Sequence, residues 1–469
     1  MGKTVNTGYM IFLAVVSAIG GILFGYDTAV ISGTIGIVTQ QFSLDTMQQG
    51  WYVGCALIGS IAGASFAGMT SDAIGRKKTM LIAAVFFCIC AIGCAESTSF
   101  AHLVAFRIIG GVGVGFVSIV SPIYISEISV AEKRGTLVSL YQLAVTIGFL
   151  IAYLVNYAIL DISQTREFQS GFLNRMLVDD YWRGMLGSGA VPAVLFLAII
   201  FFIPESPKWL ITKGRGSMAR TVLGRIYPDA ARLESEYEIT KSSLNDEVKS
   251  EWKELLQPWI LKAVLIGSAI AILGQFMGVN AVLYYGPEIF AKAGIAGGDA
   301  LFSQVLVGIV NMVTTVIALL IIDKVGRKQL VYWGVSGMIV SLVMIGIYFA
   351  FGERIGLGNG FMLAFFLFYV FCCAISISAV VFVLLSEMYP NSVRGRAMSV
   401  SGFALWVGTY LIGQLTPWLL ENLTPAGTFF LFAGMCIPYI LIMWKAVPET
   451  TGKTLEEIEG YWKRKRKNI

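Results

Sequence analysis

Apolar residues occur in long runs along the chain, and polar and charged residues gather between the runs. Each run reaches roughly 20 residues or more, the length at which an α-helix crosses about 30 Å of hydrocarbon. The ten-residue segments of alternating polarity that indicate a membrane β-barrel are absent. The pattern therefore predicts an all-α membrane protein with twelve transmembrane helices, at about residues 9–35, 49–71, 79–97, 101–126, 136–160, 184–203, 260–291, 300–322, 329–351, 360–386, 397–420 and 427–446.

A polar segment of residues 204–258 separates the sixth run from the seventh. It contains nine Lys and Arg and nine Asp and Glu, so it carries no net charge. Within it Met218, Val222, Leu223 and Ile226 recur at helical spacing, which predicts an amphipathic helix at the membrane surface. We expect four parts: an N-terminal six-helix half (1–203), a cytoplasmic helical linker (204–258), a C-terminal six-helix half (259–446) and a basic cytoplasmic tail (447–469).

The composition agrees with this interpretation. Hydrophobic residues make up 56% of the chain and charged residues only 13%, against about 25% charged residues in soluble domains. The lipid bilayer is therefore an expected partner. The first run has no small-residue cleavage signature and is too long for a signal peptide, so we expect it to stay as a membrane helix.

Basic residues in the short loops predict the orientation. The loops on one side carry ten Lys and Arg and those on the other side carry five, and the tail adds Lys463 to Lys467 to the first side. Because basic loops stay on the cytoplasmic side, we expect both termini in the cytoplasm and the protein in the inner (plasma) membrane. The tail is typical of a topology anchor, with binding to anionic lipid as the alternative.

Three short signatures occur twice, in the same order, 244 to 260 residues apart. They are Asp72-Ala-Ile-Gly75-Arg76-Lys77 with Asp323-Lys-Val-Gly326-Arg327-Lys328, Ser126-Glu127…Arg134-Gly135 with Ser386-Glu387…Arg394-Gly395, and Pro204-Glu205-Ser206 with Pro448-Glu449-Thr450. The chain therefore reads as two parallel halves of six helices. Transporters of this kind bind substrate at the interface of the halves, near the middle of the membrane.

The repeated signatures carry charges of both signs at cytoplasmic turns, which suits ion pairing between neighbouring helix ends. We expect a gating network that holds the halves together when the cytoplasmic side is closed. Its expected members are Asp72, Arg76, Glu127, Arg134, Asp323, Arg327, Glu387 and Arg394. The alternative is a set of basic loops that only set the topology, since surface ion pairs alone contribute little.

Asp27 stands near the middle of the first apolar run, where a carboxylate is costly and usually marks a functional path. Arg107 is the one basic residue well inside the runs of the first half. We therefore expect Asp27 and Arg107 to pair and to couple transport to protons. The alternative for Arg107 is a side chain that reaches the membrane surface.

Amides inside the runs are the second group of candidates, because an amide offers the donors and acceptors that match sugar hydroxyls. Helix–helix hydrogen bonds account for some such amides. The amides are Gln142, Gln275, Asn280 and Asn311. Flat apolar faces could come from Phe24, Tyr284, Tyr285, Phe382 and Trp406, although most aromatics of a membrane protein face lipid or pack in the core.

The sequence carries no signature of an enzyme. It has no candidate nucleophile–base pair and no nucleotide-binding loop. All seven cysteines lie inside apolar runs with no histidine nearby, which is typical of small buried apolar residues and not of a metal site. We expect no cofactor, no metal and no nucleic acid partner.

Taken together, the motifs resemble the sugar porter family of the major facilitator superfamily, and within it the bacterial proton-coupled xylose transporters. The resemblance covers nearly the whole chain. It rests on Phe24-Gly25-Tyr26-Asp27, Gly68…Asp72…Gly75-Arg76-Lys77, Arg134-Gly135…Gln142, Pro204-Glu205-Ser206-Pro207-Lys208-Trp209-Leu210, Gly278-Val279-Asn280-Ala281-Val282…Tyr284-Tyr285 and Pro448-Glu449-Thr450…Gly452.

The resemblance implies a major facilitator fold and proton-coupled symport, because facilitative animal members carry Asn where this chain has Asp27. It also implies which residues contact the sugar: Phe24, Gln142, Gln275, Asn280, Tyr284 and Asn311. Three positions depart from the family pattern. Gly274 replaces the first Gln of a Gln-Gln pair, Phe382 replaces a Trp, and Leu405 precedes Trp406 where the xylose transporters have Gln-Trp.

These departures make the expected pocket less polar, so Gly274 and Leu405 should set which sugar is accepted. The leading hypothesis is a proton:monosaccharide symporter for a pentose or hexose, with a xylose-like sugar as the best guess, which works as a monomer by alternating access. One alternative is a facilitative sugar or polyol uniporter in which Asp27 is only structural. Another is a sugar sensor that transports nothing.

Overall fold

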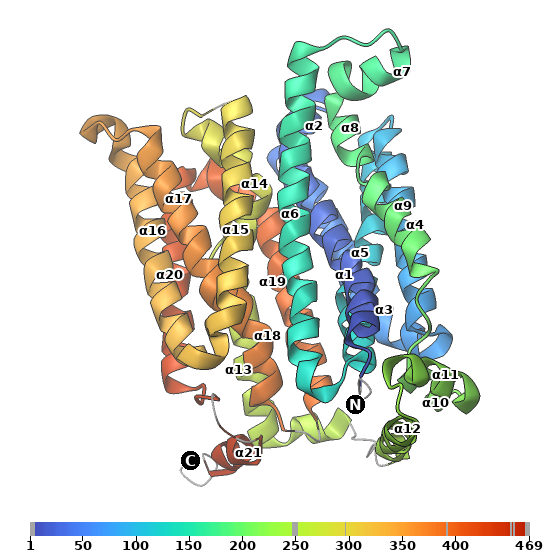
Figure 1. Cartoon of the computed structure of the whole chain (residues 1–469). Coiled ribbons are helices and arrows are strands. Elements are labelled where there is room, and N and C mark those ends of the chain that lie inside the picture. Colours follow the sequence, from blue (N-terminus) through green and yellow to red (C-terminus); the bar gives the residue numbers. More distant parts are fainter. Residues whose placement is uncertain are drawn as a thin grey trace. The chain divides into compact units, whose positions relative to one another are not determined.

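The computed structural model describes residues 5–245, 252–295, 297–390, 393–450, 453 and 455–464, and the side chain of Asp323 lies outside the described part. The described residues form helices and connecting turns, without strands (Figure 1). Twelve of the helical segments are long and apolar enough to cross a membrane. The prediction of an all-α protein with twelve spans is therefore confirmed.

By their contacts the helices group into two compact units, which we describe separately. The first unit comprises Met1–Ile31 and Ile58–Val248. Its helical segments are α1 (Thr7–Val30), the later part of α3 (Thr46–Ile74), α4 (Arg76–Ala95), α5 (Phe100–Ile128), η2 (Ala131–Lys133), α6 (Arg134–Thr165), α7 (Gly171–Asn174), η3 (Arg175–Asp179), α8 (Tyr181–Gly187), α9 (Ala190–Ile200), α10 (Pro207–Thr212), α11 (Gly216–Ile226) and α12 (Ala230–Asn245).

The second unit comprises Ser32–Leu57 and Lys249–Ile469. Its helical segments are η1 (Ile31–Gly33), which begins at the last residue of the first unit, α2 (Ile35–Gln41), the early part of α3, η4 (Trp252–Leu256), α13 (Pro258–Phe276), α14 (Val279–Lys292), α15 (Gly298–Val325), α16 (Arg327–Ile355), α17 (Asn359–Cys373), η5 (Ala374–Ser378), α18 (Ala379–Met388), α19 (Arg394–Asn422), α20 (Thr424–Lys445) and α21 (Leu455–Arg464).

Close packing of α1 on α6 forms much of the first unit, and the two helices run side by side in Figure 1. A Cβ atom on Gly25 would lie 2.0 Å from the carbonyl oxygen of Val145, and one on Gly148 would lie 2.2 Å from that of Ile22. The two backbones therefore touch through a glycine on each helix. Small residues permit this close approach in membranes, where tight van der Waals packing drives helix association.

The turn before the third span of each half has the same backbone conformation. Gly75 has φ +106° and ψ +160° before α4, and Gly326 has φ +97° and ψ +150° before α16. Only glycine adopts such positive φ values without strain. The repeated Gly-Arg-Lys motif thus encodes one turn twice, once in each unit.

Residues 32–57 belong to the second unit although they precede most of the first half in sequence. The α3 backbone lies against α19, because a Cβ on Gly50 would lie 2.0 Å from the carbonyl oxygen of Gln414. The amide of Gln414 donates to the carbonyl oxygen of Met47 at 3.0 Å. The division by contacts therefore differs from a division at the linker, and α10 to α12 of that linker join the first unit.

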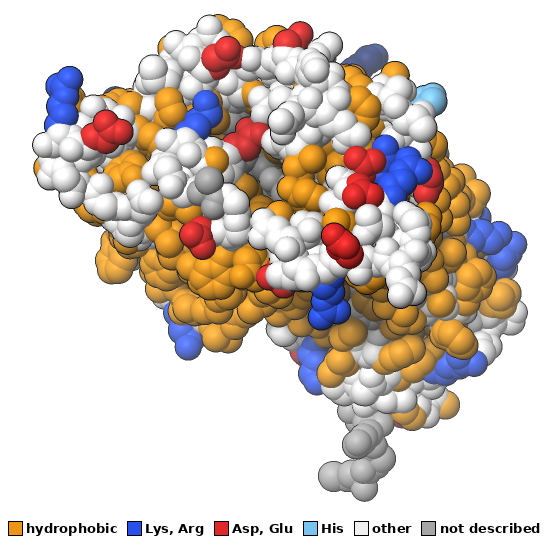
Figure 2. Space-filling model, turned by 90° about the horizontal axis from the view of Figure 1, so that it is seen from above, with side chains coloured by type: hydrophobic (Ala, Val, Ile, Leu, Met, Phe, Trp, Pro, Cys, Tyr) orange, Lys and Arg blue, Asp and Glu red, His pale blue; other side chains and the backbone are white. Residues whose placement is uncertain are grey.

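Large apolar side chains remain exposed on the flanks of the helices, where they appear as orange patches in the space-filling view (Figure 2). Phe202, Trp333 and Leu320 are examples. In water such a surface would cause aggregation. On helices of membrane length it is the surface that faces lipid, as the long apolar runs of the sequence predict.

Candidate functional site

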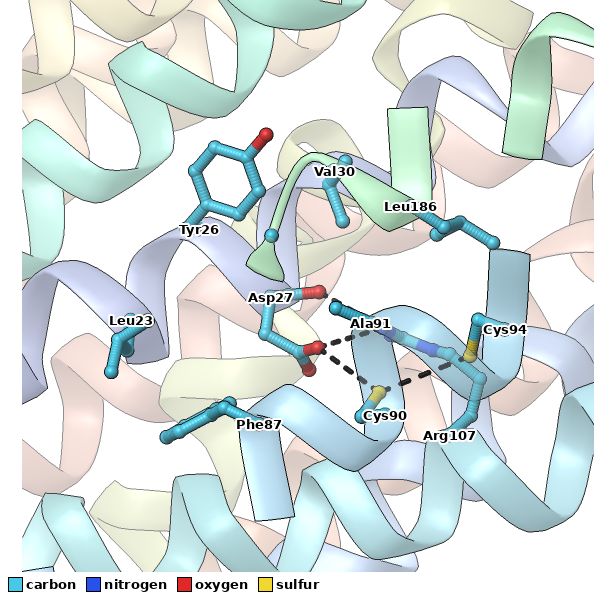
Figure 3. A pocket seen from close by; sticks show the side chains of 11 residues that line it. Leu23, Tyr26, Asp27, Val30, Phe87, Cys90, Ala91, Cys94, Arg107 and Leu186 are labelled. Carbon is cyan, nitrogen blue, oxygen red and sulfur yellow. Dashed lines mark hydrogen bonds and ion pairs between the residues drawn. The ribbon is translucent and has the colours of Figure 1, made fainter. Parts of the chain in front are cut away.

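Asp27 on α1 and Arg107 on α5 form an ion pair inside the first unit (Figure 3). The Nη1 atom of Arg107 donates to Oδ1 of Asp27 at 3.2 Å and to the backbone oxygen of Asp27 at 3.1 Å. The side chain of Asp27 is only 13% exposed and that of Arg107 only 3% exposed. A buried charge is tolerated when it is paired and hydrogen-bonded, so each side chain makes the other acceptable within the helices.

A small cavity adjoins this pair, lined by Asp27, Arg107, Cys90 and Cys94 together with apolar residues such as Phe87 and Leu186 (Figure 3). The cavity volume is about 20 Å³, enough for a water molecule beside polar groups. At its edge the hydroxyl groups of Tyr26 and Ser188 share a hydrogen bond. The Asp27 carboxylate thus borders a space that can hold a water molecule.

In the second unit the seventh span is broken between α13 and α14 by a left-handed Gly278, whose φ is +93°. A Cβ atom there would lie 2.4 Å from the ring of Phe432, so the position requires glycine for both reasons. Gln275 and Asn280 flank the break, and Nδ2 of Asn280 donates to Oε1 of Gln275 at 2.6 Å. Transporters use such broken helices at substrate sites, because the break exposes polar groups at mid-membrane depth.

Thr409 on α19 completes this polar cluster, since its hydroxyl lies 3.2 Å from the same Oε1 atom of Gln275. Gln275 is buried, and its acceptor oxygen accepts a hydrogen bond from Asn280. The single hydroxyl proton of Thr409 is shared between this oxygen and the carbonyl oxygen of Leu405. The amide nitrogen of Gln275 therefore has a fixed orientation. Sequence reasoning missed Thr409, because a Thr in an apolar helix is common and often bonds only to its own backbone.

The other predicted sugar contacts are spread over both units. Gln142 on α6 and Asn311 on α15 form no side-chain hydrogen bond within the described residues, so their amides are available to a ligand. Tyr284 is buried on α14. Phe24 on α1 and Trp406 on α19 are half-buried, whereas Phe382 on α18 is 53% exposed.

The two predicted selectivity positions are both in the second unit. A Cβ atom on Gly274 would meet only Ile377 at 3.5 Å and Tyr439 at 3.8 Å, which are ordinary van der Waals distances. Leu405 is half-buried, and its carbonyl oxygen accepts a hydrogen bond from Thr409. Gly274 therefore leaves room where a longer side chain could be placed.

Charged residues of the first repeat meet at the ends of α3, α4 and α5. The guanidinium of Arg76 donates to Glu127 through Nε at 3.0 Å and Nη2 at 3.1 Å, and to Asp72 through Nη1 at 2.8 Å. Ser206 also donates to Glu127. Arg134, which the sequence groups with Glu127, is exposed and forms no ion pair within the described residues. The partner of Glu127 is thus Arg76 and not Arg134.

Glu205 joins this first-unit network through the backbone. Its Oε1 atom accepts hydrogen bonds from the amides of Arg76 at 2.9 Å, Lys77 at 3.1 Å and Ser206 at 2.9 Å. Burial raises the pKa of Glu205 above its ordinary value, although these N–H donors act in the opposite direction. The carboxylate also lies over Gly75, where a side chain would collide with it.

The second repeat forms a similar network. Nη2 of Arg327 donates to Oε1 of Glu387 at 3.0 Å, and the amide of Lys328 donates to Glu449 at 3.3 Å. The other carboxylate oxygen of Glu387 is buried and has no hydrogen-bond partner among the residues that the structure describes. Arg394 bonds to the carbonyl oxygen of Tyr389 at 3.4 Å. The predicted contribution of Asp323 lies outside the described side chains.

Comparison with known proteins shows which family the chain belongs to. Residues 13–462 match the family described as "Sugar (and other) transporter". The chain belongs to the sugar transporter family. The family resemblance read from the motifs is confirmed, and it is a family of transporters rather than enzymes.

Named relatives of this sugar transporter are similar over nearly their full length. The arabinose-proton symporter of Bacillus subtilis is 36% identical over 457 residues, which cover 97% of this chain and 96% of the relative. The D-xylose-proton symporter of Escherichia coli is 36% identical over 494 residues, with 98% and 97% covered. The glucose transporter GlcP of Staphylococcus epidermidis is 36% identical over 454 residues, with 96% of each covered.

Solved structures support the same fold for this sugar transporter. The partially occluded inward-open xylose transporter XylE from E. coli has a TM-score of 0.82 and 34% identity, and the match covers 95% of this chain and all of that one. The major facilitator fold that the family resemblance implied is therefore confirmed.

The sugar transporter has a further intramembrane acid that sequence reasoning missed. Glu288 on α14 is half-buried, and both of its oxygens accept hydrogen bonds from Nε2 of Gln49, at 2.8 and 2.9 Å. Both residues belong to the second unit. The rule that singled out Asp27, a carboxylate within an apolar run, would have found Glu288 as well.

Proposed function

We propose that this sugar transporter is a proton-coupled symporter of a monosaccharide that works by alternating access of two six-helix halves in the inner (plasma) membrane. The observation that carries the proposal is the buried Asp27–Arg107 pair within membrane-length helices. Acids inside membrane helices are rare and typically serve proton or ion pathways. The symporters of arabinose and xylose among the relatives support the same reaction.

The Asp27–Arg107 pair couples the proton to the transport cycle. Burial favours the neutral acid, and the Arg107 guanidinium favours the carboxylate. A proton from outside neutralises Asp27, which weakens its bond to Arg107 and lets the first unit repack around bound sugar. The protein then opens inward, where the proton and the sugar leave. In this cycle each protonation state of Asp27 stabilises a different conformation.

The sugar is bound by the amides and aromatics described above. Gln142 and Asn311 offer side-chain amides that have no hydrogen-bond partner among the described residues, and Asn280 and Gln275 flank the broken seventh span. Amides match sugar hydroxyls as both donors and acceptors. The remaining proposed contacts are Phe24, Tyr284, Phe382 and Trp406.

Two charge clusters act as gates on the cytoplasmic side, where both termini lie. Arg76, Glu127 and Asp72 form the first, and Arg327 and Glu387 form the core of the second. Their ion pairs stabilise the conformation in which the cytoplasmic side is closed, and they break when that side opens. One chain supplies the proposed proton, sugar and gating residues, which supports function as a monomer.

The decisive experiment compares Asp27→Asn with wild type in reconstituted liposomes under an inward proton gradient. Asn mimics the protonated acid, so the variant should exchange sugar in counterflow but should not accumulate it. The matched control is Asp161→Asn, an exposed acid at the end of α6, which should accumulate sugar normally. Accumulation by a folded Asp27→Asn variant would refute proton coupling at this residue and favour a uniporter in which Asp27 is structural.

A further inference from the structure

The thiol of Cys90 on α4 points at the carboxylate of Asp27 (Figure 3). Its Sγ atom lies 3.6 Å from Oδ1 of Asp27, the same oxygen that Arg107 contacts. The Sγ atom of Cys94, one helical turn further on, lies 3.9 Å from that of Cys90. Both cysteines are almost fully buried. The thiols of Cys94 and Cys90 and the carboxylate of Asp27 therefore lie in a row, each in contact with the next.

Helix packing creates the space for this contact. A Cβ atom on Gly110 of α5 would lie 2.5 Å from Sγ of Cys90 and 3.4 Å from Oδ1 of Asp27. Any larger residue at Gly110 would displace the thiol. The absence of a side chain there lets α4 and α5 approach until the thiol reaches the carboxylate, so sulfur and oxygen meet through the packing of three helices.

We propose that Cys90 is a positioning residue for proton coupling, which holds the Asp27 carboxylate as a second hydrogen-bond donor beside Arg107. This inference rests on the proposed function of Asp27. A thiol is a weak donor, but a hydrogen bond to an ionised group inside a protein is stronger than one in water. The thiol can stay near Asp27 when Arg107 is released, so it remains to orient the acid for the next proton.

The direction in which loss of the Cys90 thiol should change the pH dependence of uptake follows from its role as a hydrogen-bond donor. A hydrogen bond to the carboxylate favours the ionised form. Loss of the Cys90 thiol removes a donor that only the carboxylate form uses, so the pH dependence of proton-driven uptake should move upward. The charged and titratable groups around this carboxylate are Arg107 of α5, Cys90 and Cys94 of α4 and Tyr26 of α1, whereas α8 and the turn after it supply only Leu186 and Gly189 to the cavity.

The test measures proton-driven sugar uptake into proteoliposomes against external pH for Cys90→Ala, Cys90→Ser and wild type. Cys90→Ala should move the pH of half-maximal uptake upward by about half a unit, the size of one modest hydrogen bond. Cys90→Ser keeps a donor and should restore the wild-type midpoint. Cys88→Ala removes a half-buried thiol two residues away on the same helix, and it should leave the midpoint unchanged.

Infrared spectroscopy gives a readout that does not require transport. The carboxyl band of protonated Asp27 is assigned by its loss in Asp27→Asn and is titrated in each Cys90 variant. The same upward shift is expected for Cys90→Ala. An unchanged midpoint in Cys90→Ala, or an equal shift in Cys90→Ser or Cys88→Ala, would overturn the inference.

The experiment separates this inference from the proposed function. If Asp27 is not the proton site, Asp27→Asn keeps accumulating sugar under a proton gradient. If Asp27 is the proton site but Cys90 does not position it, Asp27→Asn loses accumulation while all the cysteine variants keep the wild-type midpoint. Should Cys90→Ala fail to fold, Cys90→Val takes its place, since Val has the shape of Thr but no donor. Cys90→Val should show the upward shift and Cys90→Thr should not, and equal midpoints for the two variants would overturn the inference.

Discussion

The two charge clusters occupy equivalent places in the repeat, yet their geometry predicts different responses to the same change. Glu127 is 8% exposed and accepts hydrogen bonds from Arg76 through both oxygens and from Ser206. Glu387 is 25% exposed and accepts from Arg327 through one oxygen, and its other oxygen has no hydrogen-bond partner within the described part of the chain. We predict that Glu127→Gln is much more costly than Glu387→Gln.

The size of the difference follows from burial. Breaking a buried ion pair from one side costs about 3–5 kcal/mol, because the other charge is left uncompensated. Arg76 keeps Asp72 as a partner, but that carboxylate is 72% exposed and recovers about 1 kcal/mol at most. We therefore expect Glu127→Gln to cost about 2–4 kcal/mol. The partly exposed Glu387 should cost about 1 kcal/mol or less.

The assay is thermal unfolding in detergent, with both variants heated at the same rate because membrane proteins often unfold irreversibly. One kcal/mol corresponds to about 2–4 °C for a unit of roughly 200 residues. Glu127→Gln should therefore lower the midpoint by several degrees more than Glu387→Gln. Glu132→Gln removes an exposed acid from the same turn and serves as the control for loss of charge alone.

Two results would refute this reasoning. If the two variants lose the same stability, burial and the number of hydrogen bonds do not decide the strength of these clusters. If Glu127→Gln behaves like Glu132→Gln, the bidentate contact with Arg76 contributes nothing measurable. A double-mutant cycle of Arg76→Met with Glu127→Gln isolates the pair itself, and we expect the two changes to be strongly non-additive.

Three further predictions concern packing, selectivity and pH. Gly25→Ala should destabilise the fold by about 3 kcal/mol, because its Cβ would collide with the α6 backbone; Gly135→Ala, with open space around it, should be neutral, and similar unfolding midpoints for both would contradict the packing. Gly274→Gln with Leu405→Gln should shift the uptake ranking toward xylose, because buried hydrogen-bonding groups discriminate strongly; an unchanged ranking in a panel of labelled sugars would mean that the pocket is misplaced. Burial raises the pKa of Glu205, so Glu205 holds its proton more tightly in the folded than in the unfolded protein, and its contribution to stability falls as pH rises from 4.5 through the raised pKa. Glu205→Gln should therefore gain stability relative to wild type between pH 4 and 7. A stability difference that stays constant across this range would show that protonation of Glu205 is not linked to folding.

The sequence alone determined the membrane spans and the internal repeat. Both are local properties: an apolar run of membrane length has to be a helix, since every backbone polar group must be bonded within lipid. It also singled out Asp27 and Arg107, because few charges lie inside the runs of the first half. Their contact at 3.2 Å joins residues that are 80 positions apart, but the choice of partners within one half was already small.

Only the tertiary structure decided which neighbours those residues have. The sequence groups Glu127 with Arg134, whereas the packing of helix ends brings Arg76 to it and leaves Arg134 exposed. Contacts such as that of Cys90 with Asp27 depend on the rotation and separation of whole helices. Those are set by where glycines let backbones touch, and a one-dimensional pattern shows that glycines are present but not which helix each one faces.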